Sequence, residues 1–141
     1  MNISNTILQI MGMEIAAKLV DTTVDCETKL WRAVINTALE DVMNPAEERN
    51  SAVLKGAAHD WFCDNSEDFE FVCLNADLDP KYVRKRYLDA LEKGIIYFTK
   101  RQNLNINYTK QYDKLRKAKT SDERKLINKN ITKLREAIFK L

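Results

Sequence analysis

Turn-forming residues are scarce in this chain. Only three Gly and two Pro occur in 141 residues, whereas β-sandwiches and barrels need a tight turn after every short strand. Long helices joined by few connections fit such a composition better. The apolar fraction of 45% and the charged fraction of 31% are ordinary for a globular protein. The sequence therefore predicts a mainly α fold, a helical bundle of one domain with an appendage.

Charge is distributed unevenly along the chain, although the net charge is only +2. Residues 1–77 contain five basic and 14 acidic residues, a net charge of −9, whereas residues 78–141 contain 18 and seven, a net charge of +11. All five tyrosines lie in the basic part. Such asymmetry predicts an anionic partner for the second half. Attraction between the halves within one fold is the alternative.

Apolar residues at helical spacing predict five helices in the first two-thirds of the chain. They cover about 4–20, 27–43, 45–62, 67–76 and 80–93. Asn44 and Pro45 are suited to begin the third, as cap and first helical residue, and Gly94 to end the fifth. The second helix carries the most regular apolar stripe, which predicts a core face: Leu30, Trp31, Val34, Ile35, Ala38, Leu39 and Val42.

The last third is less regular. Period-2 alternation and β-forming residues at 95–108 predict a short β-hairpin, with a continued helix as the alternative. A short helix follows at about 108–118, and Thr120 with Glu123 predicts a capping box for a final helix at 121–141. That helix either packs on the bundle or joins another subunit through a heptad seam formed by Ile127, Ile131, Leu134 and Ile138. We expect a helical domain at 1–94 and a basic extension at 95–141.

The segment DFEFVCLNADLDPKYVRKRYLDALEKG, residues 68–94, matches the pattern of a helix-turn-helix at about 67–93. The motif needs apolar or small residues where its two helices pack, and these positions hold Val72, Cys73, Ala76, Leu78 and Val83. Two positions depart from the pattern. Asp77 replaces the usual turn Gly, and Arg86 replaces an apolar residue, for which Tyr87 would substitute.

The second helix of this motif would turn a basic face toward DNA. Lys81, Arg84, Lys85 and Leu88 share its outward side, and Arg84 and Lys85 are the candidates for base edges. Lys81, Arg86 and Lys93 are candidates for the phosphate backbone. Two basic residues of the following segment, Lys100 and Arg101, complete the predicted DNA-binding set.

Two stretches, LWRAVINTALEDV and AAHDWFCDNSEDFEFVCLNADLDPKYVRKR, resemble a family of small phage and prophage proteins. The likeness covers residues 30–86. Within it, Leu78-Asp79-Pro80 followed by Val83-Arg84 is similar to the helix-turn-helix of small terminase subunits and phage regulators. This resemblance implies binding to double-stranded DNA and assembly into oligomers in the host cytoplasm.

Residues typical of catalytic or metal sites are sparse. His59 and Asp60 are adjacent on a predicted helix and so point apart. The three cysteines, Cys26, Cys63 and Cys73, lack metal-ligand spacing and are expected to be reduced core residues. No run is apolar enough for a membrane span or signal peptide. We therefore expect no enzyme, no cofactor, no metal and no membrane contact, and a cytoplasmic location.

Three other functions remain open from the sequence. Tyr97, Phe98 and Tyr108 could stack on single-stranded bases. The acidic half could serve a phage-encoded protein–protein adapter, or an inhibitor of a host factor, by imitating nucleic acid. The final helix could build a structural oligomer.

Overall fold

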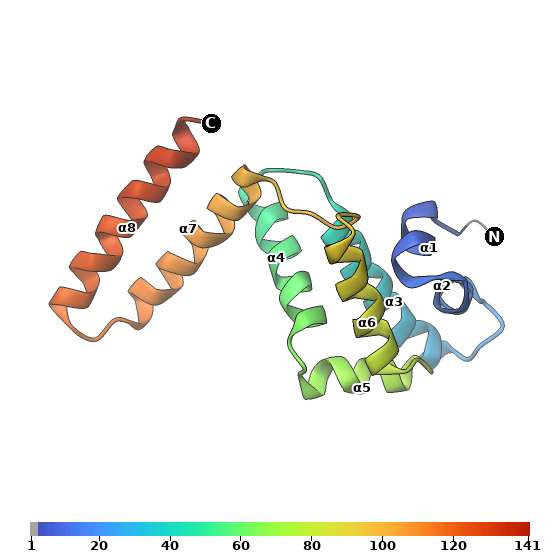
Figure 1. Cartoon of the computed structure of the whole chain (residues 1–141). Coiled ribbons are helices and arrows are strands. Elements are labelled where there is room, and N and C mark those ends of the chain that lie inside the picture. The colour runs from blue at the N-terminus through green and yellow to red at the C-terminus, as the bar shows by residue number, and fades with distance from the viewer. Residues whose placement is uncertain (1–2) are drawn as a thin grey trace. The chain divides into compact units, whose positions relative to one another are not determined.

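The structure, a computed structural model, describes residues 3–141. This part of the chain forms eight α-helices and no strand (Figure 1). The helices are α1 (Asn5–Met11), α2 (Met13–Val20), α3 (Cys26–Met43), α4 (Arg49–Cys63), α5 (Glu67–Asn75), α6 (Pro80–Glu92), α7 (Lys100–Lys117) and α8 (Ser121–Phe139). The predicted α fold is confirmed. The predicted β-hairpin at 95–108 is wrong, because most of that stretch lies in α7.

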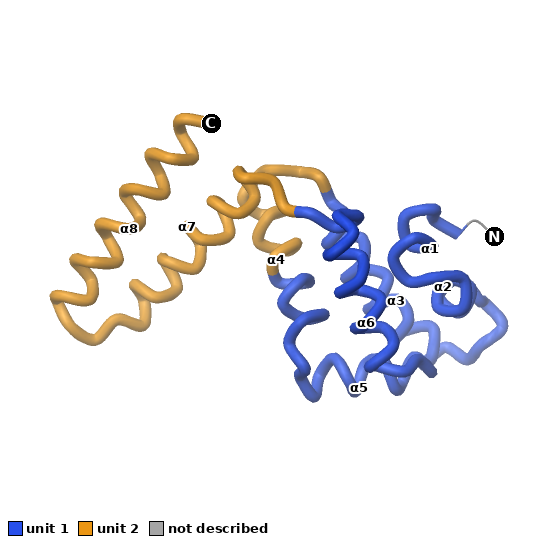
Figure 2. The backbone as a smooth tube through the Cα atoms, in the orientation of Figure 1, with its two compact units in different colours: residues 1–44, 57–97 blue, residues 45–56, 98–141 orange. Residues whose placement is uncertain are grey.

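The chain divides into two compact units, coloured separately in Figure 2. The acidic unit comprises residues 1–44 and 57–97, and the basic unit comprises residues 45–56 and 98–141. The acidic unit has eight Lys and Arg against 15 Asp and Glu, a net charge of −7. The basic unit has 15 against six, a net charge of +9. The sequence grouped residues 45–56 with the first domain, whereas here they belong with the second.

The acidic unit is built around an aromatic core. Phe62 of α4 stacks on Tyr87 of α6, with ring centroids 4.3 Å apart and planes inclined by 11°. Phe69 of α5 meets the edge of Phe62 at 6.0 Å, and all three residues are buried. Aliphatic side chains of α1, α2 and α3 complete this core. Burying aromatic and aliphatic surface from six helices is what stabilises this unit.

A glycine separates the first two helices, where the sequence predicted one continuous helix. Gly12 has a φ of +85°, which ends α1 and begins α2. The Arg86 guanidinium lies against this turn, and a Cβ at position 12 would come within 3.3 Å of Arg86 Nη2. The Arg86 Nε and Nη2 atoms donate to the carbonyls of Ile10 and Gln9, at 3.1 and 3.3 Å. Glycine at this position therefore allows both the conformation and the approach.

The core face of α3 is narrower than its apolar stripe predicted. Ile35, Leu39 and Val42 are fully buried, but Leu30 is 60% exposed and Val34 38% exposed. Arg32 lies on the buried side with Ile35 and Leu39 and is only 4% exposed. An arginine on the buried side of a helix needs partners for its charge, and those partners belong to the candidate site described below.

The basic unit begins with an extended segment. The sequence predicted a helix from Pro45, but α4 begins at Arg49. Polar side chains of α7 bind the backbone that such a helix would use. Gln102 donates to the Ala46 carbonyl at 3.0 Å, and Asn105 donates to the Glu47 carbonyl at 2.9 Å. These carbonyls are therefore drawn away from the helical hydrogen-bond pattern.

Helices α7 and α8 form an antiparallel hairpin connected at residues 118–120. Thr99 and Gln102 form a capping box at the start of α7, which favours the helix over the predicted hairpin. Thr120 caps α8 by accepting from the Glu123 amide. The predicted heptad seam of α8 faces α7. Ile131 is 4% exposed, and Ile127, Leu134 and Ile138 are half-buried.

Candidate nucleic-acid interface

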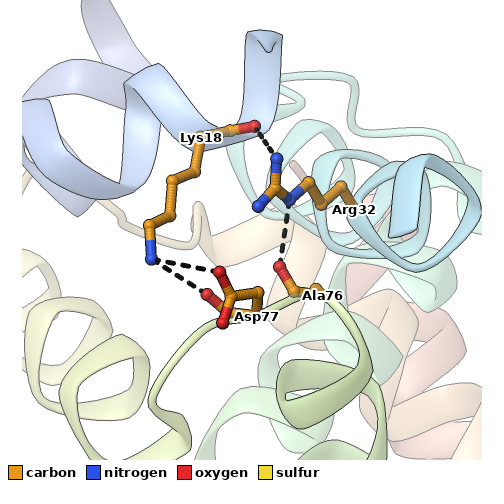
Figure 3. Close-up of polar contacts among 4 residues, drawn as sticks. All are labelled: Lys18, Arg32, Ala76 and Asp77. Atoms are coloured by element: carbon orange, nitrogen blue, oxygen red, sulfur yellow. Dashed lines mark hydrogen bonds and ion pairs between the residues drawn. The ribbon is translucent and has the colours of Figure 1, made fainter. Parts of the chain in front are cut away.

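The α5–α6 pair is joined by a four-residue turn, residues 76–79. Asp77 has a φ of +59°, the left-handed conformation that usually favours Gly but that Asp tolerates. Figure 3 shows that two basic side chains converge on this turn from other helices. Lys18 of α2 donates to the Asp77 carbonyl at 3.0 Å, and its Nζ lies 3.7 Å from the Asp77 carboxylate. The turn is therefore fixed by residues outside the helix pair.

Arg32 provides the buried part of this arrangement. Its Nε donates to the Ala76 carbonyl at 3.0 Å, and its Nη1 donates to the Lys18 carbonyl at 2.8 Å (Figure 3). The Ala76 carbonyl belongs to the C-terminal end of α5, and the Lys18 carbonyl to that of α2. Carbonyls at helix C-termini lack helical partners and favour cations. Sequence reasoning missed both Lys18 and Arg32, because their partners in the turn are 59 and 44 residues away, respectively.

The start of α6 follows the predicted pattern. Asp79 accepts from the Lys81 amide at 3.0 Å, and Pro80 occupies the first helical position. Gly94, with a φ of +76°, follows the helix as expected. The buried side of α6 carries Val83, Tyr87 and Ala90.

The outward side of α6 lines an open groove of about 700 Å³. Lys81, Arg84, Lys85 and Leu88 border it, together with Leu74 of α5. Lys81, Lys85 and Leu88 are exposed, and Arg84 is half-buried. The Arg84 Nε atom is buried and has no hydrogen-bond partner within residues 3–141. Four of the predicted DNA-binding residues are thus neighbours on one surface.

The remaining predicted DNA-binding residues are placed elsewhere. Arg86 is half-buried and binds the α1 carbonyls. Lys93 is exposed at the C-terminal cap of α6. Lys100 and Arg101 belong to the basic unit, where an Arg101 Nη2 donates to the Leu141 carbonyl at 2.9 Å.

Carboxylates share the α6 groove with these cations. Glu70, Asp79 and Asp89 are among the lining residues, and Glu67, Asp68 and Glu70 fall in the first turn of α5. Negative charge near a phosphate is unfavourable, whereas Asp and Glu accept hydrogen bonds from the amino group of cytosine. The groove is therefore better suited to base edges than to the phosphate backbone.

The basic unit carries a second constellation that the sequence did not predict as a site. Arg135 of α8 lies 3.1 Å from the Tyr112 hydroxyl and 3.4 Å from the Tyr108 hydroxyl. The Arg49 guanidinium lies 5.3 Å from the centre of the Tyr108 ring. Hydrogen bonding with Tyr112 and Arg135 lowers the pKa of the Tyr108 hydroxyl. Tyr108, a candidate for base stacking, is therefore already engaged within the unit, while Tyr97 is 63% exposed.

Neither Cys63 nor Cys73 is placed as a reactive thiol. Cys73 is fully buried, and burial raises the pKa of its thiol to about 12. Cys63 is half-buried and its thiol pKa is also raised by burial, so neither is an activated thiolate. Cys26, expected in the core, is exposed at the start of α3. His59 Nδ1 lies 2.8 Å from the Tyr87 hydroxyl.

Within residues 3–141 we find no group of three acidic, His or Cys side chains placed to hold a metal ion. None of the helices described is both long enough and apolar enough to cross a membrane.

Comparisons with protein-family models, with curated proteins and with solved structures returned no match. The resemblance to small phage helix-turn-helix proteins accordingly stays a prediction.

Proposed function

We propose that this protein binds double-stranded DNA through α6, as the resemblance to small terminase subunits and phage regulators implies. The observation that carries the proposal is the orientation of α6. Its inner side is buried against Phe62 and Phe69, and its outer side presents Lys81, Arg84, Lys85 and Leu88 along one groove. A helix held in this way can enter a major groove.

Two features of the α5–α6 pair support its use as a rigid reading element. Lys18 and Arg32 hold the turn from outside, so that the two helices keep one relative orientation. Arg84 lines the groove, and an Arg side chain can bind guanine through two hydrogen bonds. In this proposal Arg84 and Lys85 contact bases, and Lys81 contacts a phosphate.

Fluorescence anisotropy with labelled duplexes, both random and genomic, tests the proposal at about 50 mM salt, where phosphate contacts are strongest. We expect binding by the native chain and a loss of roughly 10- to 100-fold when Arg84→Ala and Lys85→Ala are combined, since each base contact contributes about 1–3 kcal/mol. Lys29→Ala with Arg124→Ala removes the same charge from exposed positions outside α6 and is the matched control. Absence of duplex binding, or equal losses in both variants, would contradict the proposal.

A second candidate function rests on a different surface of the acidic unit. Trp31 of α3 contacts Phe71 of α5 edge to face, with centroids 5.2 Å apart. Phe71 is 54% exposed and Leu30 60% exposed, and the buried Trp31 Nε1 atom has no hydrogen-bond partner. Exposed aromatic and aliphatic side chains in an acidic unit are typical of protein-binding surfaces. This favours the adapter or inhibitor role, with a basic protein partner.

Capture of partners from a nuclease-treated host lysate tests this second candidate. We expect Phe71→Asp to abolish capture and Leu126→Asp, a similar change at an exposed leucine of the basic unit, to leave it intact. The adapter role replaces DNA binding if capture depends on Phe71 and the isolated protein binds no duplex. If both variants capture equally, this surface has no such role.

A further inference from the structure

A row of exposed cations lies on the α7–α8 hairpin. Nine Lys and Arg side chains occur between residues 110 and 133, and all nine are exposed. Among these residues the structure records one ion pair, between Arg116 and Asp113. Eight of the nine cations therefore have no carboxylate within ion-pair distance, although holding so many like charges together is unfavourable in the free protein.

Helical spacing gathers five of these lysines on one side of the hairpin. Lys110, Lys114 and Lys117 follow one another by four and three residues along α7, which places them on one face. Lys129 and Lys133 are four residues apart on α8 and share their face with Leu126, three residues before Lys129. These five lysines are called the lysine face below.

A shallow groove of about 420 Å³ places the α7 row beside Leu126, which shares its face of α8 with Lys129 and Lys133. Lys114 and Lys117 line it from α7, and Glu123, Leu126 and Asn130 line it from α8. The opposite side of the hairpin is occupied differently, since there Arg135 binds the hydroxyls of Tyr108 and Tyr112. The cations of the lysine face are therefore available to an external anion.

We propose that the lysine face binds the phosphate backbone of nucleic acid without reading its sequence. Five ammonium groups, each a point charge on a flexible stem, can neutralise phosphates but lack the planar fork that recognises a base or a single phosphate ester geometrically. The identity of the polyanion as nucleic acid rests on the proposed function. This inference gives the two surfaces different roles. Helix α6 contacts bases beside the carboxylates of Glu70, Asp79 and Asp89, and the lysine face contacts phosphates.

Salt dependence separates the two roles, because each lost phosphate contact reduces the slope of log K against log salt by about 0.9. We would measure duplex binding between 50 and 300 mM salt for the full chain, for Lys114→Gln with Lys117→Gln, and for the variant with all five lysines changed to Gln. The double variant should lower the slope by about 1.8, and the five-lysine variant by about 4.5. Affinity at about 0.1 M salt should fall at least 10-fold and 100-fold, respectively.

The matched control is Lys29→Gln with Arg124→Gln, two exposed cations that do not line the hairpin groove. It should leave the slope within about 0.5 of the native value. Surface Lys→Gln changes should leave helicity unchanged, which circular dichroism verifies. A control that weakens binding as much as the double variant would show that net charge, not this face, is responsible, and would overturn the inference.

Retention on immobilised heparin distinguishes failure of this inference from failure of the proposed function. Loss of heparin retention in the five-lysine variant but not in Arg84→Ala/Lys85→Ala, together with absent duplex binding, would leave the lysine face as a polyanion surface and remove the DNA-reading role. Duplex binding with an unchanged salt slope in the five-lysine variant would keep the DNA-reading role and overturn the lysine face.

Discussion

The acidic and basic units of this protein are stabilised in different ways. The acidic unit packs six helical segments around buried aromatic rings and fixes one turn with charged donors from distant helices. The α7–α8 hairpin is a pair of helices of 18 and 19 residues in which α8 contributes a single fully buried side chain, Ile131. A well-enclosed core can orient a reading helix accurately, whereas a thin hairpin exposes the most charge for its length.

The greatest expected effect is on the stability of the acidic unit alone. Arg32→Met removes the buried donor to the Ala76 and Lys18 carbonyls, leaving both without that partner. We expect the free energy of unfolding of the acidic unit to fall by about 3 kcal/mol. Both tryptophans, Trp31 and Trp61, lie in this unit, so urea unfolding followed by tryptophan fluorescence reports on it selectively.

Lys29→Met on the same helix is the control for that change, because Lys29 is exposed and should alter stability by less than about 0.5 kcal/mol. Equal shifts for Arg32→Met and Lys29→Met would show that the buried guanidinium does not stabilise the turn.

Ile131→Ala probes the basic unit in the same way. Truncating this buried side chain should cost about 2–4 kcal/mol of local stability, seen as faster hydrogen exchange along α7 and α8 and little change in tryptophan fluorescence. Leu126→Ala, at a position 62% exposed, should cost less than about 1 kcal/mol. Light scattering of both variants addresses oligomerisation through the predicted seam of Ile127, Ile131, Leu134 and Ile138. Loss of an oligomer in Ile131→Ala without loss of helicity would show that the seam joins subunits.

Neutralising acidic residues beside the α6 groove should reduce the contrast in charge between the units. Glu67 and Glu70 are exposed in the first turn of α5, and Glu70 lines the groove. If DNA lies against α6, Glu67→Gln with Glu70→Gln should strengthen duplex binding about 3- to 10-fold at low salt and less at high salt. Glu27→Gln with Glu40→Gln, exposed on α3, is the matched control. Unchanged affinity would place the DNA away from this end of α5.

The smallest effect concerns the turn residue. Asp77→Gly should stabilise the acidic unit by up to about 1 kcal/mol, because Gly adopts the left-handed conformation without a steric penalty. Asp77→Ala keeps the penalty and loses the exposed contact with Lys18, so we expect a destabilisation of about 1 kcal/mol. Thermal unfolding monitored by tryptophan fluorescence compares the two. A more stable Ala variant would mean that the φ of +59° carries no cost.

Local signals in the sequence predicted much of this fold. Asp79, Pro80 and Gly94 delimit α6 as expected, and Thr120 caps α8, because caps and breakers act over a few residues. The break at Gly12 was missed because the apolar spacing continues across it, and only Arg86, 74 positions later, explains the turn.

Long-range partners account for some of the other errors. Gln102 and Asn105 bind the backbone at residues 46 and 47, which no local pattern predicts. The capping box of Thr99 and Gln102 was a local signal for α7 that sequence reasoning missed. The outward residues of α6 could be placed from the sequence, since they follow from its buried face. The lysine face could not, because it requires knowing that α7 and α8 pair side by side.

The dependence of the turn on Lys18 and Arg32 has a consequence for how the α5–α6 pair can be reused. A peptide holding only residues 66–94 would lack both donors and would keep only the local bonds of the turn, from the Asp77 and Leu78 amides to the Leu74 and Cys73 carbonyls. We therefore expect the turn to be less stable in that peptide than in the full chain. The pair is not a portable module that could be grafted alone with its turn intact.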